Sequence, residues 1–190
     1  MFLIIGLGNP GKEYQNTWHS LGRLSVNHWR TSMGFPDFYK KARFNSLVSE
    51  GVFDDKEIIL ALPETFMNNS GKAVKLLIGN WKLKIENCVV VHDDADLPQG
   101  KLRISKDRGT AGHKGIDSIV KALKSKSFVR IRIGIRPTNY VPGSKSLDRF
   151  VLKKFTKNEE RIVAGVIKKT SEAIGMILKD ELPQAMSQFN

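Results

Sequence analysis

A histidine and three carboxylates follow a continuous run of apolar residues near the middle of the chain. The run at 88–91 leads directly into the segment HDDAD at 92–96. Three neighbouring carboxylates can bind Mg²⁺ for phosphoryl chemistry. One of them can instead hold a histidine ring in one tautomer and stabilise its cationic form. A solvated acidic turn has the same composition, so this segment alone leaves three interpretations open.

A glycine-rich turn, GLGNPG at 6–11, follows an apolar N-terminal segment. Its spacing matches the dinucleotide fingerprint GxGxxG, which requires a helix that opens within the turn and points at the pyrophosphate. Here Pro10 lies inside the turn, and helical periodicity begins only near Thr17. We therefore interpret the segment as a tight turn that presents Asn9, whose amide can both donate and accept, at the carboxyl end of a strand.

His19 lies shortly after this turn, early in a predicted helix. A lone histidine is more often structural than catalytic, but α/β proteins bind their ligands at the carboxyl ends of strands. A histidine there can act as a base near neutral pH. The sequence has no GxSxG elbow, so we do not expect a serine nucleophile. A second glycine-rich segment at 109–115 leads into a basic helix, where backbone N–H groups and Lys114 would suit a phosphate.

The elements that must hold these residues alternate between strands and helices. Apolar runs and alternation predict strands at 1–7, 44–52, 56–62, 87–93, 101–105 and 128–136, with a hairpin turn at Asp54-Asp55. Helical spacing of apolar residues predicts helices at 17–32, from 68–71 to about 83, at 113–125 and at 158–179. This order predicts an α/β fold with a mixed, twisted central sheet flanked by helices, in one domain over 1–190.

Several local predictions accompany these elements. Thr17 and Ser70 are expected to cap the helices that follow them. The strict alternation of 128–136 predicts a strand with one wet, basic face. That face would carry Arg130, Arg132 and Arg136. Residues 33–43 should form turns, and the Pro/Gly/Ser loop at 137–147 is long enough to be mobile and functional.

Positive charge is concentrated in one part of the chain. The formal net charge is +12, residues 1–100 are balanced, and residues 101–136 carry eleven Lys and Arg against two acidic residues. Such a concentration favours a polyanion-binding face, although a solvated basic surface without a partner would have the same charge.

The remaining composition is typical of an ordinary globular protein. Cys88 is the single cysteine and lies in an apolar run, so it is expected to be a core residue in a reducing compartment. The apolar N-terminus lacks a basic region and is too short for a signal peptide. No segment approaches the roughly 20 apolar residues of a membrane span, so we expect a cytoplasmic protein.

Taken together, the distinctive segments stand in a characteristic order. They are GLGNPG (6–11) followed by Tyr14 and Thr17-Trp18-His19, TFMNNSG (65–71), VVHDDADLPQGKLR (90–103), GHKG (112–115), RIRIGIRP (130–137) and DRFVL (148–152). On these residues the chain resembles bacterial-type peptidyl-tRNA hydrolases from residue 1 to about 155. The resemblance implies a monomeric, three-layer αβα protein that cleaves the ester between a peptide and the 3′ ribose of tRNA. Peptidyl-tRNA that drops off ribosomes would be its substrate, with no cofactor, metal or stable protein partner.

The resemblance also implies roles by position. His19 would be the general base that activates water, and Asp93 would orient and polarise it. Asn9 and Asn68 would bind the peptide backbone and the reacting carbonyl, where amide donors stabilise a developing oxyanion. Further substrate contacts would come from Tyr14, Met67 and Lys114 in the cleft, and from Arg103, Lys106, Arg108 and Arg132 on the tRNA.

Three positions depart from the usual residues of this family. Trp18 and Ser20 stand where the family has arginine and asparagine, and Lys114 replaces the asparagine of GHNG. These changes leave an RNA-binding paralogue with weak or no hydrolase activity as an alternative function. A metal-dependent phosphoesterase that uses the carboxylates of 92–96 is a second alternative, and that reaction alone would be sensitive to EDTA.

Overall fold

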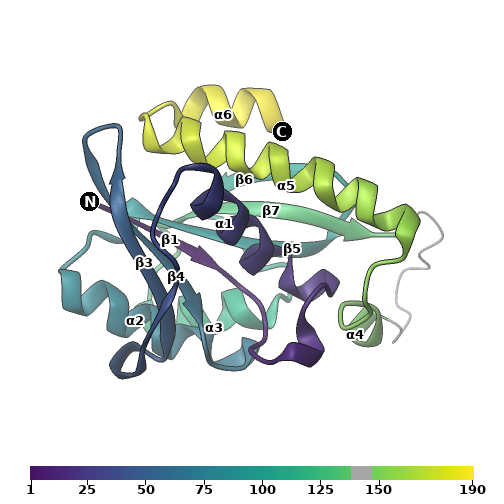
Figure 1. Ribbon diagram of the computed structural model, residues 1–190, viewed down its shortest axis with the longest axis horizontal. Helices are drawn as coiled ribbons and strands as arrows, with labels where there is room; N and C mark the ends of the chain where they lie inside the picture. Colours follow the sequence, from purple (N-terminus) through teal and green to yellow (C-terminus); the bar gives the residue numbers. More distant parts are fainter. Residues whose placement is uncertain (138–146) are drawn as a thin grey trace.

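Seven strands form one mixed sheet in the order β2-β3-β4-β1-β5-β7-β6 (Figure 1). The strands are β1 Phe2–Gly6, β2 Tyr39–Lys41, β3 Ser46–Phe53, β4 Lys56–Pro63, β5 Cys88–Pro98, β6 Leu102–Lys106 and β7 Val129–Arg136. This computed structural model describes residues 1–137 and 147–190, so nearly all of the loop predicted at 137–147 lies outside the described residues.

The four central strands, β4, β1, β5 and β7, run parallel, whereas β3 and β6 run antiparallel to their neighbours. The carboxyl ends of the parallel strands therefore lie together at one end of the sheet. The chain order reverses at β1, since β4 pairs on one side of it and β5 on the other. Open α/β sheets bind ligands at such a switch point, so the topology points to the loops after β1, β4 and β5.

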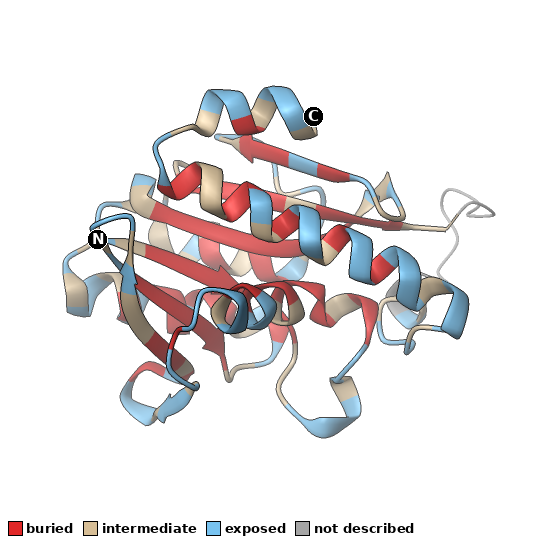
Figure 2. Cartoon of the chain, turned by 45° about the horizontal axis from the view of Figure 1, so that its top comes forward, coloured by how far each residue is buried: buried red, intermediate tan, exposed pale blue. Residues whose placement is uncertain are grey.

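Helices cover both faces of the sheet. They are α1 Leu21–Ser32, α2 Ser70–Trp81, α3 Lys114–Leu123, α4 Leu147–Phe150, α5 Lys157–Leu178 and α6 Leu182–Phe189. One core joins α1, α5 and α6 to Ile4 and Val91, and the other joins α2 and α3 to Ile5 and Val90. Figure 2 shows the central strands largely buried between these layers. Burial on both faces accounts for the apolar runs of β1 and of the first half of β5. The predicted α/β class with a mixed sheet is confirmed.

Three short elements differ from the prediction. β2 lies within the predicted turn at 33–43, and α4 and α6 lie where no helix is predicted. The three residues of β2 are mostly exposed and pair with one neighbour, so they lack the apolar alternation that identifies a strand. α6 contributes one fully buried residue, Ala185, and it packs on α5 and β6. Among the described residues, no helix has both the length and the apolar composition needed to cross a bilayer.

The two expected helix caps are wrong. The hydroxyls of Thr17 and Ser70 each donate to a carbonyl three residues earlier, at 2.8 Å, so neither accepts from the helix that follows. In both places a 3₁₀ turn, Trp18–Ser20 or Met67–Asn69, comes before the α-helix. His19 and Asn68 consequently lie in tight turns in front of a helix start, not in the helices themselves.

The wet face predicted for β7 is wrong at Arg130, which is 2% exposed. β7 lies inside the sheet between β5 and β6. The Arg130 guanidinium donates at 2.9 Å to the carbonyl of Gly109, in the connection that leads from β6 to α3. That connection therefore covers Arg130, whereas Arg132 and Arg136, nearer the carboxyl end, stay half-buried.

Cys88 is confirmed as a core residue. Its side chain is buried at the start of β5. Burial, together with the charge of Glu86, raises the pKa of the thiol to about 12. Because the thiolate is the reactive form, this cysteine is inert near neutral pH.

Replacement of Gly22 by alanine should strongly destabilise the fold. A Cβ at this position of α1 would lie 2.2 Å from the Val91 carbonyl oxygen and 2.6 Å from the Leu7 backbone, neither of which can turn aside. We expect the free energy of unfolding to fall by about 3 kcal/mol, measured by urea denaturation. In α5, a Cβ on Gly165 meets nothing within 4 Å. Gly165→Ala should therefore raise the free energy of unfolding by about 0.5 to 1 kcal/mol. Equal stability of the two variants would contradict this packing.

Candidate active site

The predicted site residues come together at the carboxyl ends of the parallel strands. A cavity of about 680 Å³ opens there. It is lined by six of the seven residues predicted to bind or cleave the substrate, namely Asn9, His19, Met67, Asn68, Asp93 and Lys114. Residues that follow β1 and β4, residues of β5 itself and the start of α3 thus build one site, beside the switch point at β1.

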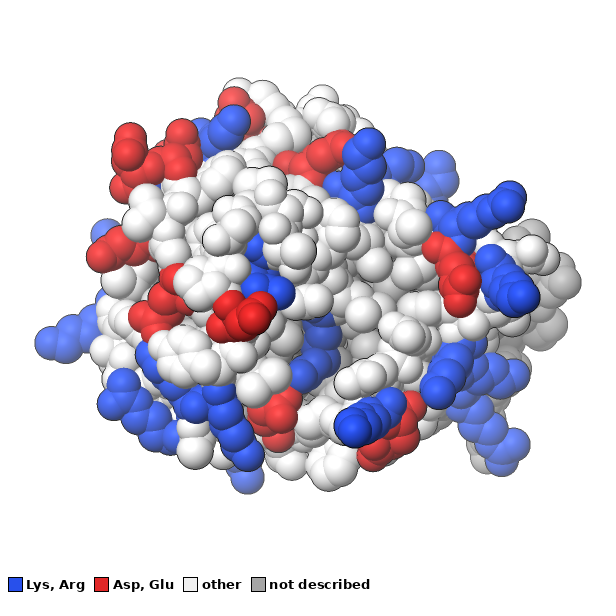
Figure 3. Space-filling model, in the orientation of Figure 1, with Lys and Arg blue, Asp and Glu red and all other residues white. Residues whose placement is uncertain are grey.

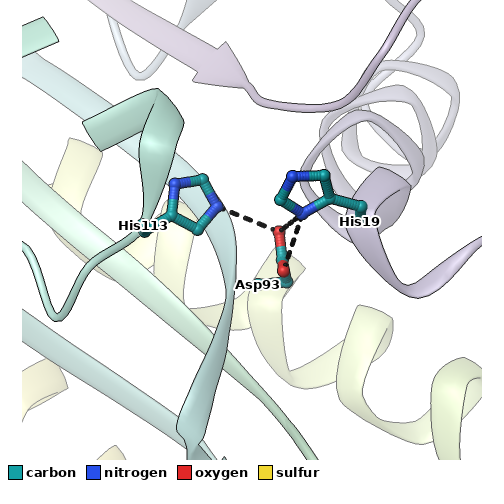
Figure 4. Close-up of side chains that lie close together, drawn as sticks. All are labelled: His19, Asp93 and His113. Atoms are coloured by element: carbon teal, nitrogen blue, oxygen red, sulfur yellow. Dashed lines mark hydrogen bonds and ion pairs between the residues drawn. The ribbon is translucent and has the colours of Figure 1, made fainter. Parts of the chain in front are cut away.

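Asp93 lies between two histidine rings (Figure 4). Nδ1 of His19 is 2.9 Å from both carboxylate oxygens, and Nε2 of His113 is 3.1 Å from Oδ1. His19 comes from the turn before α1, and His113 is the residue directly before α3. The two rings lie side by side, with their centroids 5.2 Å apart, and both reach the same carboxylate, so three segments of the chain meet at one buried charge.

Backbone hydrogen bonds determine where the His113 proton lies. Nδ1 of His113 accepts from the N–H groups of Gly115 and Ile116, both at 3.2 Å, and so caps the N-terminus of α3. A ring nitrogen that accepts carries the lone pair, so we assign the proton of the neutral ring to Nε2, which donates to Asp93. Helix capping therefore makes His113 a donor to the carboxylate.

The contact with Asp93 also fixes the tautomer of His19. Because Asp93 accepts from Nδ1–H, the lone pair of the neutral His19 ring lies on Nε2. The His19 side chain is 13% exposed and lines the cavity, whereas the Asp93 side chain is 3% exposed. A buried carboxylate thus holds a partly exposed ring in the tautomer that can take a proton from water.

Asp93 is ionised although it is buried. Burial favours its neutral form, but the positive charge that His19 or His113 carries when protonated, together with their N–H donors, outweighs burial and holds its pKa well below the usual range. The neighbouring His92 is fully buried; burial and the charge of His113 lower its pKa well below the ordinary value. Its Nδ1–H donates to the Asp93 carbonyl at 2.6 Å, so His92 is a neutral residue that supports the strand.

Two amide side chains line the same cavity as the histidine pair. Oδ1 of Asn9 accepts from the Met67 N–H at 2.9 Å, which orients the amide and leaves its amino group to donate to a substrate. Asn68 is exposed and lines the same cavity. Met67 is buried, and a Cβ on Gly115 would lie 2.5 Å from its sulfur, so that glycine makes room for the cavity wall. The turn after β1 presents Asn9 as expected.

Tyr14 contacts the site indirectly. Its ring meets Phe66 edge-on, with the centroids 6.5 Å apart, and Phe66 lines the cavity. Its carbonyl accepts from the hydroxyls of Thr17 and Ser20, at 2.8 and 2.7 Å. Tyr14 therefore supports the turn that carries His19, and the Ser20 hydroxyl is committed to that turn.

The four residues predicted to bind tRNA line a single groove. They are Arg103, Lys106, Arg108 and Arg132. The groove has a volume of about 710 Å³ and meets the first cavity at Ala111, which lines both. Nε of Arg132 is 2.6 Å from Oδ2 of the buried Asp94, so this arginine is also a structural ion pair. The other three cations give the groove the excess positive charge that attracts a polyanion.

Exposed basic side chains also surround the segment between α4 and α5. They are Arg149, Lys153, Lys154 and Lys157. In the space-filling view, Lys and Arg gather at the right-hand end of the molecule, where α4 lies (Figure 3). Val151 and Leu152 of this segment line the cavity. The basic surface near the site is therefore wider than the segment 101–136.

The three carboxylates of β5 diverge, so they form no common magnesium site. Asp93 faces the histidines, Asp94 pairs with an arginine, and Asp96 is exposed. Among the described residues, the ligand atoms that could share a metal belong to His19, Asp93 and His113, within 4.8 Å of one another. A metal there would need the lone pair of Nε2 on His113, but that nitrogen carries the proton while Nδ1 caps α3. Hydrogen bonding alone accounts for this cluster.

A histidine backed by a buried carboxylate and accompanied by amide donors is typical of hydrolases that activate water for attack on a carbonyl. The fold places this arrangement at the switch point of an α/β sheet, beside a basic groove. The fold is thus of the α/β class, and the site has the groups of a hydrolase beside a groove whose positive charge suits an anionic ligand.

Comparisons with known proteins make the family specific. The family model described as "Peptidyl-tRNA hydrolase" matches residues 3–190. A peptidyl-tRNA hydrolase from Thermoanaerobacter sp. (strain X514) is 39% identical and one from Bdellovibrio bacteriovorus is 37% identical, each over 100% of both chains. A crystal structure of peptidyl-tRNA hydrolase from Acinetobacter baumannii matches with a TM-score of 0.92 at 32% identity, over 100% of this chain and 94% of that one. The chain therefore belongs to the peptidyl-tRNA hydrolase family.

Sequence reasoning misses three contributors to the site. His113 comes directly before α3 and directly after a glycine. A polar side chain at that position is a sequence signal for an N-cap of the helix that follows. Phe66 and Leu152 are 57% and 44% exposed and line the cavity. Exposed apolar residues beside a cavity mark a binding surface, but their exposure becomes visible only in the structure.

Proposed function

We propose that this protein hydrolyses the ester bond between the peptide and the 3′ ribose of peptidyl-tRNA. The observation that carries the proposal is the hydrogen-bonded pair of His19 and Asp93 in a cavity lined by Asn9 and Asn68, in a chain of the peptidyl-tRNA hydrolase family. These side chains supply a base, a buried carboxylate and amide donors, which are the groups that ester hydrolysis needs.

His19 is the general base of the proposed reaction. Its Nε2 accepts a proton from water as the water oxygen attacks the ester carbonyl carbon, and a tetrahedral intermediate forms. Asp93 stabilises the imidazolium through the Nδ1–H that it already accepts. The imidazolium then returns the proton to the 3′ oxygen of the ribose as the carbon–oxygen bond breaks. The products are the peptide acid and tRNA with its 3′ hydroxyl.

The amides of Asn9 and Asn68 stabilise the negative oxygen of the intermediate. The Asn9 amide is already oriented by its bond to the Met67 backbone, so little reorganisation is needed when charge develops. A donor of this kind contributes about 3 kcal/mol in comparable sites. Lys114 lines the same cavity and adds a cation at the position where the family has an amide.

The cavity and the groove divide the substrate between them. The acceptor end of tRNA lies in the groove of Arg103, Lys106, Arg108 and Arg132, and the terminal ribose reaches the cavity past Ala111. The peptide packs against the exposed apolar side chains of Phe66 and Leu152. Recognition is then electrostatic for the nucleic acid and apolar for the peptide.

We also propose that the protein works in the cytoplasm as a monomer without a stable protein partner. Its substrate is released from ribosomes, which places the reaction in that compartment. Every residue used in the proposed reaction comes from one chain, so the site requires no second copy. The reaction uses no cofactor.

Release of labelled N-acetyl-aminoacyl groups from tRNA tests the proposed reaction. We expect release to continue in EDTA, because the base is a histidine held by Asp93 and the carboxylates of β5 diverge. Label released only with Mg²⁺, lost in EDTA and still esterified to a nucleotide would support the metal-dependent phosphoesterase. No release with tRNA binding intact would identify the RNA-binding paralogue. Similarity over the full chain to proteins named peptidyl-tRNA hydrolase favours neither alternative.

Arg103→Ala should weaken tRNA binding and make it less sensitive to salt. Arg103 is exposed in the groove, so its loss removes one phosphate contact without disturbing the core. The slope of log K against log salt should become shallower by about 1, measured by filter binding. Arg132→Ala is a poorer probe, because it leaves Asp94 buried without its partner.

Lys40→Ala is the matched control for charge. Lys40 is exposed on β2, at the opposite edge of the sheet from β6. Its replacement removes one positive charge and should leave the slope unchanged. Identical slopes for Arg103→Ala and the wild-type protein would exclude Arg103 from the tRNA contact.

A further inference from the structure

We infer that Trp18 is a positioning residue that holds the turn of His19 in place over Asp93. The inference rests on the proposed role of His19 as the base. Trp18 is adjacent to His19 in the same three-residue 3₁₀ turn, and it is 1% exposed. A single 3₁₀ turn has weak hydrogen-bond geometry of its own, so its position depends on what it packs against.

The Trp18 ring packs against two phenylalanines from a distant part of the chain. It stacks on Phe150, with the centroids 5.6 Å apart and the planes at 24°, and it meets Phe155 edge-on at 5.0 Å. Offset stacking and edge-to-face contacts are the two favoured arrangements of aromatic rings. Phe150 ends α4 and Phe155 precedes α5, so Trp18 packs against the segment that joins these helices.

Backbone hydrogen bonds join the same two segments. The His19 N–H donates to the Val151 carbonyl at 2.8 Å, and the Trp18 N–H donates to the Lys153 carbonyl at 3.4 Å. Thr17 forms an antiparallel bridge with Lys154. Figure 1 shows the turns around 12–20, in purple, beside the green segment that contains α4. The backbone of His19 is therefore hydrogen-bonded to the same segment that packs on the Trp18 ring. The packing of the ring fixes how the two segments lie against each other.

This anchor connects the base to the wall of its own cavity. Val151 accepts from the His19 backbone and also lines the cavity. A displacement of the 150–155 segment would therefore move His19 relative to Asp93, and a misplacement of 1 Å can cost about 100-fold in rate. The family resemblance leads to an expectation of arginine here, whereas in this chain an indole makes the anchor.

Trp18→Ala should lower kcat for ester hydrolysis about 10- to 100-fold and change KM by less than about threefold. The indole N–H has no hydrogen-bond partner among the described residues, so Trp18→Phe should keep the aromatic contacts and restore kcat to within about threefold. The Nδ1–H proton resonance of His19, assigned by its loss in His19→Asn, should broaden in Trp18→Ala and return in Trp18→Phe. If Trp18→Ala does not fold, Phe155→Leu trims one side of the anchor and should reduce kcat severalfold.

Trp29 provides a matched control in the same helix layer. It is also 1% exposed and also packs between two phenylalanines, Phe35 and Phe53, at 5.2 and 5.4 Å. Trp29→Ala should lower the melting temperature but leave kcat of the folded protein unchanged. A folded Trp18→Ala with normal kcat, or with a raised KM alone, would overturn the positioning role. Turnover by His19→Ala would instead remove the proposed base, so the two failures are distinguishable.

Discussion

His19→Ala should lower kcat for peptide release about 10³-fold and leave the affinity for tRNA nearly unchanged. General-base catalysis by a positioned side chain contributes about 10² to 10⁴ in rate, and the amides of Asn9 and Asn68 remain to stabilise the intermediate. A loss of 10³ corresponds to about 4 kcal/mol in the activation free energy. The tRNA groove lies apart from His19, so filter binding should give the wild-type dissociation constant.

The controls separate loss of the base from loss of the fold. His28→Ala removes an exposed histidine of α1 whose ring meets Ser171 at 2.9 Å, and turnover should not change. His19→Asn keeps a donor for Asp93 without a base and should be as inactive as His19→Ala. Added imidazole should restore part of the activity of His19→Ala, because the ring leaves a space beside the cavity. Turnover near the wild-type rate in His19→Ala would end the general-base assignment.

The central strands are predictable from the sequence because both of their faces are buried. Residues 88–91 are continuously apolar for that reason, and the two faces belong to two different cores. The edge of the sheet follows no such pattern. β2 pairs on one side and is mostly exposed, and its three residues resemble a turn. α6 buries little of its own surface, so periodicity identifies it poorly.

The proposed catalytic pair is predictable only as two candidates in separate segments. His19 and Asp93 are 74 positions apart, and each has a structural interpretation when taken alone. The resemblance to a family supplies the pairing, and topology explains it, since the parallel pairing of β1 and β5 places Gly6 opposite Val91, two residues before Asp93. Family membership and the reaction class follow from ordered motifs, which survive the changes at Trp18, Ser20 and Lys114.

Contacts between residues far apart in the sequence account for the remaining differences between prediction and structure. The burial of Arg130 depends on the connection at Gly109, and no local pattern reports that contact. The tautomer of His113 depends on two backbone N–H groups of α3 and a carboxylate on β5. Trp18 looks like an ordinary apolar residue until Phe150 and Phe155 are placed beside it.

Asp93→Asn should lower kcat by about 10³ to 10⁴, as much as the loss of the base itself. His113 holds its proton on Nε2 because Nδ1 caps α3, so the amide oxygen of an asparagine must face His113. The amino group then replaces Oδ2 and donates to Nδ1 of His19, 2.9 Å away in the native structure. His19 consequently takes the opposite tautomer, with its proton on Nε2, and cannot accept one from water. Asp96→Asn, at an exposed position of the same strand, should keep normal turnover.

The same substitution should change how stability depends on pH. The folded pKa of Asp93 lies below the value of about 3.9 expected for the unfolded chain, so its ionisation stabilises the fold above that pH. This contribution is lost as the pH falls below about 4, whereas an asparagine does not titrate. The difference in unfolding free energy between wild type and Asp93→Asn, from urea titrations, should therefore be largest above pH about 5 and shrink toward pH about 3. A difference that stays constant across this range would mean that His19 and His113 do not stabilise the charge of Asp93, and the proposed stabilisation of the imidazolium would lose its basis.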